Sequence, residues 1–313
     1  MRILVAGGGR LVVSVLEPLL DAGHTIVGLL QNGRRTPQDG RTWFHAKRFL
    51  MPPALDPAAL AYRRRIPVYW LDRMDESELA PLRALAPDLI LTAGFSIIFN
   101  EALLALPALG CVNVHSSLLP KHRGPSPFAH VILAGEKESG ITFHTMTTDI
   151  DAGTILAQDS FSLNALDTSV TVYYRCCDLA ADMTADVIED IETKGLVGRA
   201  QSAAASSYDP RITEDFVQID WRDSAEYIER VVRASLAYYP AWFMHHGRRV
   251  RVYRATFDPR PIDAAPGTVL ETRPYPVVAT GAGRLVIHHA RATRPIPWNW
   301  PAPWAPLHRA EVL

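Results

Sequence analysis

Cysteine, an excess of charge of one sign and long apolar runs are all scarce in this sequence. The three cysteines, Cys111, Cys176 and Cys177, are odd in number and form no C-x-x-C pair, so we interpret them as reduced thiols of a reducing compartment. With a net charge of −1, the chain as a whole has no positive electrostatic potential that would attract nucleic acid or an anionic membrane. No apolar run approaches the roughly 18 residues of a membrane span, and the chain opens on a strand-like segment, so we expect no span, no signal peptide and a cytoplasmic protein.

A complete dinucleotide-binding fingerprint is also missing. Gly7, Gly8 and Gly9 follow the first strand-like segment, but Val12 stands where the last glycine of G-x-G-x-x-G belongs. A dinucleotide-dependent oxidoreductase is therefore a weak alternative. Failure to bind NAD(P) in a titration would exclude it.

The first half of the chain alternates short apolar runs with segments of helical periodicity. Such βαβ alternation is typical of α/β proteins and predicts a Rossmann-like, mostly parallel sheet with helices on both faces. The expected strands are residues 3–6, 25–30, 67–70, 88–92, 110–115 and 140–146, with another from 154, and the expected helices are 11–20, 76–86, 126–135 and 168–193.

The second half has a different character. Residues 195–211 are small and polar, which predicts a linker. One helical segment, 223–237, then precedes short strand-like runs separated by turn residues, a pattern typical of a small OB-like β-barrel. We therefore predict a catalytic domain at 1–194, the linker, and a C-terminal barrel at 212–313 that ends in an aromatic, Pro-rich tail. The strand-like runs are 249–256, 267–271, 277–280 and 285–289.

The clearest chemical signal lies at the end of the strand 110–115. Asn113 and His115 are two residues apart, so both point to one face of the strand, as does Cys111. Ligands of open α/β sheets bind outside the carboxyl ends of the strands, so an amide and an imidazole are presented together at the expected mouth of a site. An acidic turn around Asp149 and Asp151 follows the next strand.

The motifs NVHSSLLPKHRGPSP, GITFHTM and DIDAGTIL resemble the folate-dependent formyltransferases, a family that includes methionyl-tRNA and nucleotide-sugar N-formyltransferases. The resemblance extends upstream through LTAGFSIIFNEALLALPALGCVNVH and downstream to VQIDWRDSAEYIERVVRA and PAWF. It implies that the family's catalytic Asn-x-His and Asp fall on Asn113, His115 and Asp151. The turn Gly7 to Gly9 departs from the family, which usually has Gly-Thr/Ser-Pro there.

The resemblance implies a formyl donor, N10-formyltetrahydrofolate, and two sets of binding residues. On the donor side, the family holds the pterin largely through the loop after the fourth strand and the acidic turn. On the acceptor side, the candidates follow the Asn-x-His strand. The donor-side candidates are Ala93, Gly94, Phe95, Ser96, Ile97, Leu118, Thr148, Asp149 and Asp151, and the acceptor-side candidates are Ser117, Lys121, Arg123 and Pro125.

Formyl transfer suits these residue types. Negative charge develops on the formyl oxygen when an amine attacks, and an asparagine amide can donate to it. A neutral histidine can remove the amine proton, and a carboxylate can orient the imidazole. Asp149 is a competing carboxylate, to which we assign a structural or capping role. No His or Cys cluster accompanies the D-x-D pair, so we predict no metal, and we expect His144 to be a buried structural residue.

The acceptor is the least determined part of the prediction. Residues 32–66 are basic, either as a solvated loop or as a substrate-facing one, but QNGRRTPQDGRTWFHAKRF matches poorly the Arg-Pro-Ala-Gly-Arg-Gly-like stretch of the methionyl-tRNA enzymes. The helix 223–237 mixes glutamates with arginines, unlike a phosphate-binding face. We therefore expect a small primary amine, on a nucleotide-linked amino sugar or an amino-acid-like metabolite precursor. Methionyl-tRNA, hydrolysis of formyl-folate and a catalytically silent binding module are the alternatives, and the oligomeric state stays open.

Overall fold

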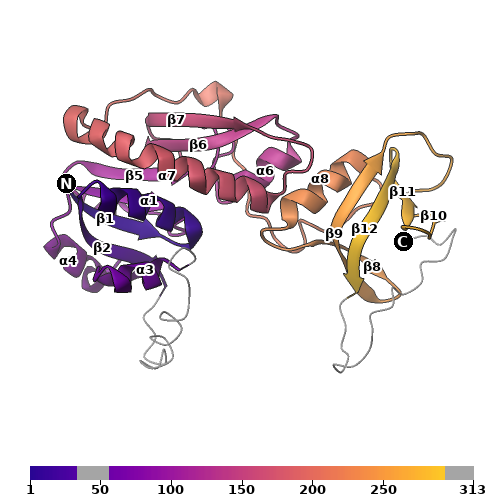
Figure 1. Cartoon of the computed structure of the whole chain (residues 1–313), viewed down its shortest axis with the longest axis horizontal. Helices are drawn as coiled ribbons and strands as arrows, with labels where there is room; N and C mark the ends of the chain where they lie inside the picture. Colours follow the sequence, from indigo (N-terminus) through magenta and orange to yellow (C-terminus); the bar gives the residue numbers. More distant parts are fainter. Residues whose placement is uncertain (34–55, 293–313) are drawn as a thin grey trace. The chain divides into compact units, whose positions relative to one another are not determined.

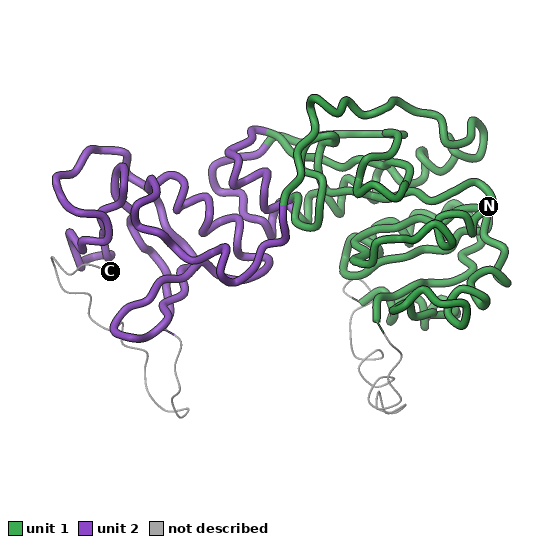
Figure 2. Tube along the Cα trace, turned by 180° about the vertical axis from the view of Figure 1, so that it is seen from behind, with its two compact units in different colours: residues 1–127, 138–162, 173–209 green, residues 128–137, 163–172, 210–313 purple. Residues whose placement is uncertain are grey.

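The structure is a computed structural model that describes residues 1–33 and 56–292 (Figure 1). Part of the basic region 32–66 and the whole aromatic tail therefore lie outside the described residues. The chain divides into two compact units, shown in green and purple in Figure 2. The first comprises residues 1–127, 138–162 and 173–209, and the second comprises 128–137, 163–172 and the residues from 210 onward. These units interleave along the chain, whereas the domain limits predicted from the sequence are continuous and stay a prediction.

The first unit is built on one seven-stranded sheet in the order β3-β2-β1-β4-β5-β6-β7. The first five strands run parallel, and β6 and β7 pair antiparallel at one edge. The mostly parallel α/β sheet predicted from the sequence is confirmed. Its strands are β1 (Arg2–Gly7), β2 (Thr25–Asn32), β3 (Val68–Leu71), β4 (Leu89–Ala93), β5 (Gly110–His115), β6 (Glu138–Thr145) and β7 (Ile155–Ser162).

Helices cover the sheet because their apolar positions recur at helical spacing. Leu79 and Leu82 of α4 and Leu103 of α5 pack with Leu4 and Ile90 in one core cluster. Figure 1 shows α1 and α7 in front of the sheet. The helices of the first unit are α1 (Gly9–Asp21), α3 (Pro57–Arg63), α4 (Glu76–Ala84), α5 (Glu101–Leu104) and all but the start of α7 (Ser169–Lys194), whereas α6 (Pro127–Leu133) belongs almost entirely to the second unit.

The sequence analysis missed α3, which lies in a region expected to be irregular. Its start has ordinary helix signals, because the side chain of Asp56 accepts a hydrogen bond from the N–H of Ala58 and Pro57 occupies the first turn. Three alanines and Leu60 of this helix are buried. Because arginines surround these apolar residues in the sequence, the segment did not show a clear helical pattern. Among the described residues, no helix is both long and apolar enough to cross a membrane.

The second unit contains a five-stranded antiparallel sheet in the order β10-β11-β12-β9-β8. The small antiparallel C-terminal domain is confirmed, but β8 was not predicted, and within residues 210–292 no pairing joins β10 to β8 to close a barrel. The helix α8 begins at Ser224, whose side chain accepts a hydrogen bond from the N–H of Tyr227. The elements are α8 (Ala225–Ser235), β8 (Ala241–His245), β9 (Arg248–Asp258), β10 (Val269–Glu271), β11 (Val277–Ala279) and β12 (Arg284–Ala292).

Candidate active site

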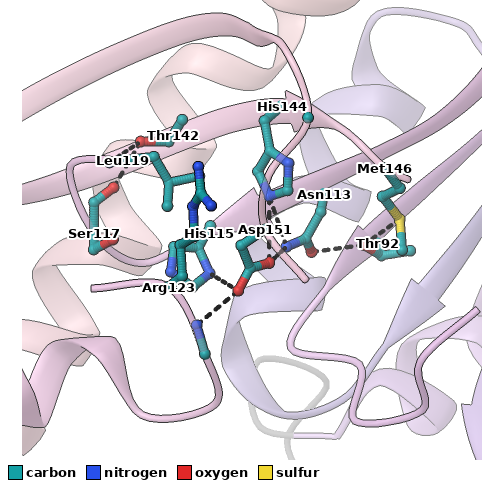
Figure 3. Close-up of polar contacts among 12 residues, drawn as sticks. Thr92, Asn113, His115, Ser117, Leu119, Arg123, Thr142, His144, Met146 and Asp151 are labelled. Carbon is teal, nitrogen blue, oxygen red and sulfur yellow. Dashed lines mark hydrogen bonds and ion pairs between the residues drawn. The ribbon is translucent and has the colours of Figure 1, made fainter. Parts of the chain in front are cut away.

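Three polar side chains form a row across neighbouring strands near the carboxyl end of β5. The register pairs Asn113 of β5 with Thr92 of β4 on one side and with His144 of β6 on the other. Asp151 approaches the row from the turn after β6 (Figure 3). Strand register therefore brings together residues that are far apart in the sequence, and it includes His144, which we had expected to be only structural.

The amide of Asn113 has one defined orientation. The hydroxyl of Thr92 donates to Asn113 Oδ1 at 2.6 Å, so the amide nitrogen faces the other way. Asn113 Nδ2 lies 3.1 Å from His144 Nε2 and 3.3 Å from Asp151 Oδ1. His144 Nδ1 lies 2.9 Å from the carbonyl of Thr145, which can only accept, so we assign the ring proton to Nδ1 and make Nε2 the acceptor from Asn113.

His115 is almost completely buried, and its two ring nitrogens have different surroundings. Nε2 lies 2.8 Å from the carbonyl oxygen of His122 and must donate to it, which leaves the lone pair of the neutral ring on Nδ1. Nδ1 lies 3.6 Å from Asp151 Oδ2. Burial lowers the pKa of His115 below its usual value, against the opposing effect of Asp151. The ring is therefore neutral at neutral pH. A proton taken up at Nδ1 would lie close to the carboxylate of Asp151.

Asp151 is held in a left-handed backbone conformation with φ of +51°. Burial by itself raises its pKa, but the neighbouring His115, the side chain of His144 and the N–H of Gly124, which donates to Oδ2 at 2.8 Å, outweigh burial and hold that pKa well below the usual value. Asp151 is thus ionised at neutral pH. The site combines an oriented amide donor, a neutral imidazole and a carboxylate.

The pKa shift of His115 predicts a pH dependence. If His115 acts as the base, kcat/KM is lost when pH falls through its pKa, and because that pKa is lowered, the loss occurs below about pH 6.5, the unperturbed value for histidine. A pH profile of kcat/KM checks this. In Asp151→Asn the acid limb should move further toward acid, since the charge that raises the His115 pKa is gone. An acid limb above pH 6.5 in the wild type would contradict the assignment.

The predicted donor-side residues flank this row. Ala93 ends β4 and is buried, and Gly94 has φ of +65°, a conformation that favours glycine. Phe95 meets Phe99 edge to face, with ring centroids 5.7 Å apart, and it packs against the core cluster, as does Ile97. The remaining predicted residues are Ser96, whose hydroxyl accepts a hydrogen bond from Asn32, the half-buried Leu118, and the exposed Thr148 and Asp149 of the acidic turn.

The predicted acceptor-side residues differ in accessibility. Ser117 is fully buried, and its hydroxyl donates to the carbonyl of Lys121 at 3.0 Å, so it shapes the loop. Lys121 and Pro125 are exposed. Arg123 is half-buried and donates from Nε and Nη2 to Gln201 Oε1 at 3.1 and 2.7 Å. The structure thus adds Gln201, which no local motif in the sequence had indicated.

The three cysteines are free, as predicted, and all three are buried. Cys111 shares the strand face of Asn113 but belongs to the core cluster, with its sulfur near the carbonyls of Leu103 and Leu104. Burial raises the pKa of Cys111 to about 12 and that of Cys177 to about 11. Neither thiol is a candidate nucleophile, since thiolate is the reactive form.

Comparison with known proteins supports the formyltransferase resemblance along most of the chain. Residues 55–188 match the formyl transferase family, and residues 211–300 match the formyl transferase C-terminal domain. A methionyl-tRNA formyltransferase of Thiobacillus denitrificans is 34% identical over 93% of this chain and 92% of its own length, and one of Marinobacter nauticus is 33% identical over 93% and 91%.

Solved structures share the fold at lower identity. An N-formyltransferase from Helicobacter canadensis in complex with folinic acid and dTDP-3-aminofucose has a TM-score of 0.68 and 20% identity, covering 93% of this chain and 99% of that one. A sugar 3N-formyl transferase with dTDP and 5-N-formyl-THF has a TM-score of 0.67 and 19% identity, covering 95% and 99%. With curated relatives above 30% identity along nearly the whole chain, this protein belongs to the folate-dependent formyltransferase family and is an enzyme whose formyl donor is N10-formyltetrahydrofolate.

Proposed function

We propose that this enzyme formylates a primary amine and that Asn113, His115 and Asp151 carry out the transfer. The observation that carries the proposal is their mutual geometry. An amide whose oxygen is already bonded turns its N–H groups toward the site, and beside it the free ring nitrogen of a buried neutral imidazole lies 3.6 Å from an ionised carboxylate. These are the three functions that acyl transfer to an amine needs: an oxyanion donor, a base and an orienting charge.

Asn113 is the proposed oxyanion donor. Its Nδ2 has two hydrogens and two acceptors, and the longer contact, 3.3 Å to Asp151 Oδ1, is the one that a developing oxyanion can replace. Because Thr92 fixes the amide oxygen, the donor needs no reorientation when charge develops.

His115 is the proposed base. Its Nδ1 takes a proton from the attacking amine while the new C–N bond forms, and Asp151 stabilises the resulting imidazolium. When the bond between the formyl carbon and N10 of the folate breaks, that nitrogen recovers a proton from the same pair, so tetrahydrofolate leaves neutral at N10. The protons and bonds balance without a further reactant.

For the acceptor, we give first place to methionyl-tRNA, which replaces our sequence-based preference for a small amine. The supporting observation is that similarity to the methionyl-tRNA formyltransferases covers both units. Residues 210–292 also carry twelve arginines, no lysine and nine acidic residues, a local positive balance hidden by the chain's net charge of −1. Arg248, Arg254 and Arg291 of this unit are exposed and available to phosphates.

A small amine is the second candidate, for a specific reason. Seven of those twelve arginines are ion-paired within the unit, including both arginines of α8, which pair with glutamates four residues earlier. A paired guanidinium contributes less to phosphate binding, so the helix is not a basic face. The fold likeness to sugar N-formyltransferases is compatible with such an acceptor.

An assay that follows release of tetrahydrofolate from N10-formyltetrahydrofolate separates these candidates. It compares methionyl-tRNA, amino-sugar nucleotides and ornithine-like amines, with formate detection to reveal hydrolysis. We expect turnover with methionyl-tRNA. Turnover confined to a small-amine pool would support the second candidate, and formate release without an acceptor would favour the hydrolase alternative. Absence of folate binding would contradict the proposed chemistry.

A further inference from the structure

The segment 199–209, which the sequence analysis treated as linker, is bonded into the first unit beside the candidate active site. Its beginning pairs with β7, since the backbone groups of Arg199 and Ile155 bond in both directions at 2.9 Å. Its end pairs with the loop after β5, where Arg123 N–H donates to the carbonyl of Ser207 at 3.0 Å and Asp209 N–H donates to that of Arg123 at 2.8 Å. Both ends are therefore fixed by backbone bonds that no side-chain substitution removes.

Gln201 lies between these two anchors and uses both ends of its amide. Nε2 donates to the carbonyls of Asp151 and Gly153, at 2.8 and 2.7 Å. Oε1 accepts from Nε and Nη2 of Arg123, at 3.1 and 2.7 Å. Carbonyls only accept and a guanidinium only donates, so the orientation of the Gln201 amide is unambiguous.

The turn that Gln201 holds has little other freedom. Asp151 has positive φ, an uncommon conformation for a residue other than glycine, and a Cβ at Gly153 would lie 1.8 Å from the carbonyl of Thr145. In this conformation the Oδ2 atom of Asp151 lies 3.6 Å from Nδ1 of His115. Gln201 bonds to the carbonyl of Asp151 itself, so it restrains the peptide group next to the Cα that carries this side chain.

We propose that Gln201 is a positioning residue for formyl transfer: it fixes the Asp151 turn against His115 and joins that turn to Arg123. The inference rests on the proposed roles of His115 and Asp151. Gln201 touches neither reacting group, so its effect is on geometry. Without it, the Asp151 carboxylate moves away from Nδ1 of His115, and a displacement of about 1 Å near the chemistry lowers rates by roughly a hundredfold.

Two substitutions of Gln201 change its hydrogen bonds in different ways. Gln201→Leu removes all four hydrogen bonds at similar volume. Gln201→Glu keeps an acceptor for Arg123 but presents a carboxylate oxygen to two carbonyls, so it should displace the turn most. Gln158→Leu is the matched control, because Gln158 is another half-buried glutamine that accepts from an arginine of the same segment, Arg199 Nη2, at 2.5 Å, and donates to the carbonyl of Leu119 and the hydroxyl of Thr142, at 2.9 and 2.7 Å. None of these three hydrogen bonds involves the Asp151 turn.

The readout is the titration of His115, followed by NMR on histidine-labelled full-length protein and assigned with a His115→Gln variant. It needs no acceptor. The charged or titratable groups that act on His115 are Asp151, His144 and His122, and Asp151 is the one among them that raises the pKa through its charge, so loss of the carboxylate contact should lower the pKa of His115. We expect Gln201→Leu, which adds no charge, to lower it in the same direction as Asp151→Asn, while Gln158→Leu leaves it unchanged. In Gln201→Glu the added carboxylate itself acts to raise the pKa of His115, so that variant is read by kcat.

The outcomes distinguish this inference from the proposed function. If Asp151→Asn moves the His115 titration and Gln201→Leu titrates like the wild type, Gln201 is not a positioning residue and the catalytic assignment stands. If Asp151→Asn also leaves the titration unchanged, the proposed His115–Asp151 pair is wrong, and the inference fails with it. Where an acceptor turns over, kcat in the Gln201 variants should fall about 10–100-fold with KM for N10-formyltetrahydrofolate within about threefold.

Discussion

Replacement of His115 by alanine is expected to lower kcat for formyl transfer by roughly 10²–10⁴-fold, because the variant loses its base for the attacking amine. The neutral form of His115 is favoured by burial, and its Nδ1 is the only ring nitrogen with a free lone pair, since Nε2 donates to the carbonyl of His122. Single-turnover kinetics with N10-formyltetrahydrofolate and the acceptor that turns over would measure the loss.

A matched control shows whether the loss of kcat is specific to His115 or is a general effect of removing a buried imidazole. His130 is also buried, and its Nε2 lies 2.9 Å from the carbonyl of Pro210, an environment that resembles the Nε2 contact of His115. His130→Ala should cost stability without a comparable loss of kcat. If His115→Ala kept more than about a tenth of the wild-type kcat, another group would have to be the base.

Asn113→Ala should lower kcat by roughly 10²–10³-fold, the usual effect of deleting one oxyanion donor. Asn113→Asp is the sharper test, because the shape is kept while the N–H donor is lost and a second carboxylate is placed 3.3 Å from Asp151. Binding of 5-formyltetrahydrofolate should persist in the alanine variant, since Asn113 acts on the charge that develops during the reaction.

The orienting role of Thr92 gives a smaller, related effect. Thr92→Val removes the 2.6 Å hydrogen bond to Asn113 Oδ1 and lets the amide rotate, so part of the donor effect is lost while the residue volume is kept. We expect kcat for Thr92→Val between those of the wild type and Asn113→Ala. Equal values for Thr92→Val and the wild type, with Asn113→Ala impaired, would show that the amide holds its orientation without Thr92.

Local sequence patterns predicted much of the fold. Alternating apolar runs and helical periodicity located all seven strands of the first sheet, because each of these signals depends on residues within one element. The misses have local physical causes. The helix α3 is short and set among arginines, α5 has only four residues, and β8 follows α8 closely and has no alternation of apolar and polar residues, since Ala241, Trp242 and Phe243 are consecutive and buried.

In the candidate site, too, the features that depend on one short segment were predicted, and those that depend on tertiary contacts were not. The face shared by Asn113 and His115 follows from the two-residue period of a strand, and Asp151 followed from the family motif. The row of Thr92, Asn113 and His144 does not follow from any local pattern. Thr92 and Asn113 are 21 positions apart and Asn113 and His144 are 31 apart, so these residues meet only through strand register.

The sequence by itself therefore determined the fold class, the family and the residue types of the site, since all of these are written in short segments. Tertiary structure alone decided which nitrogen of His115 is free, because that depends on the carbonyl of His122. It also decided that Gln201 belongs to the site. A glutamine 50 residues from Asp151 has no local signature, and only folding brings its amide to the Asp151 turn and to Arg123.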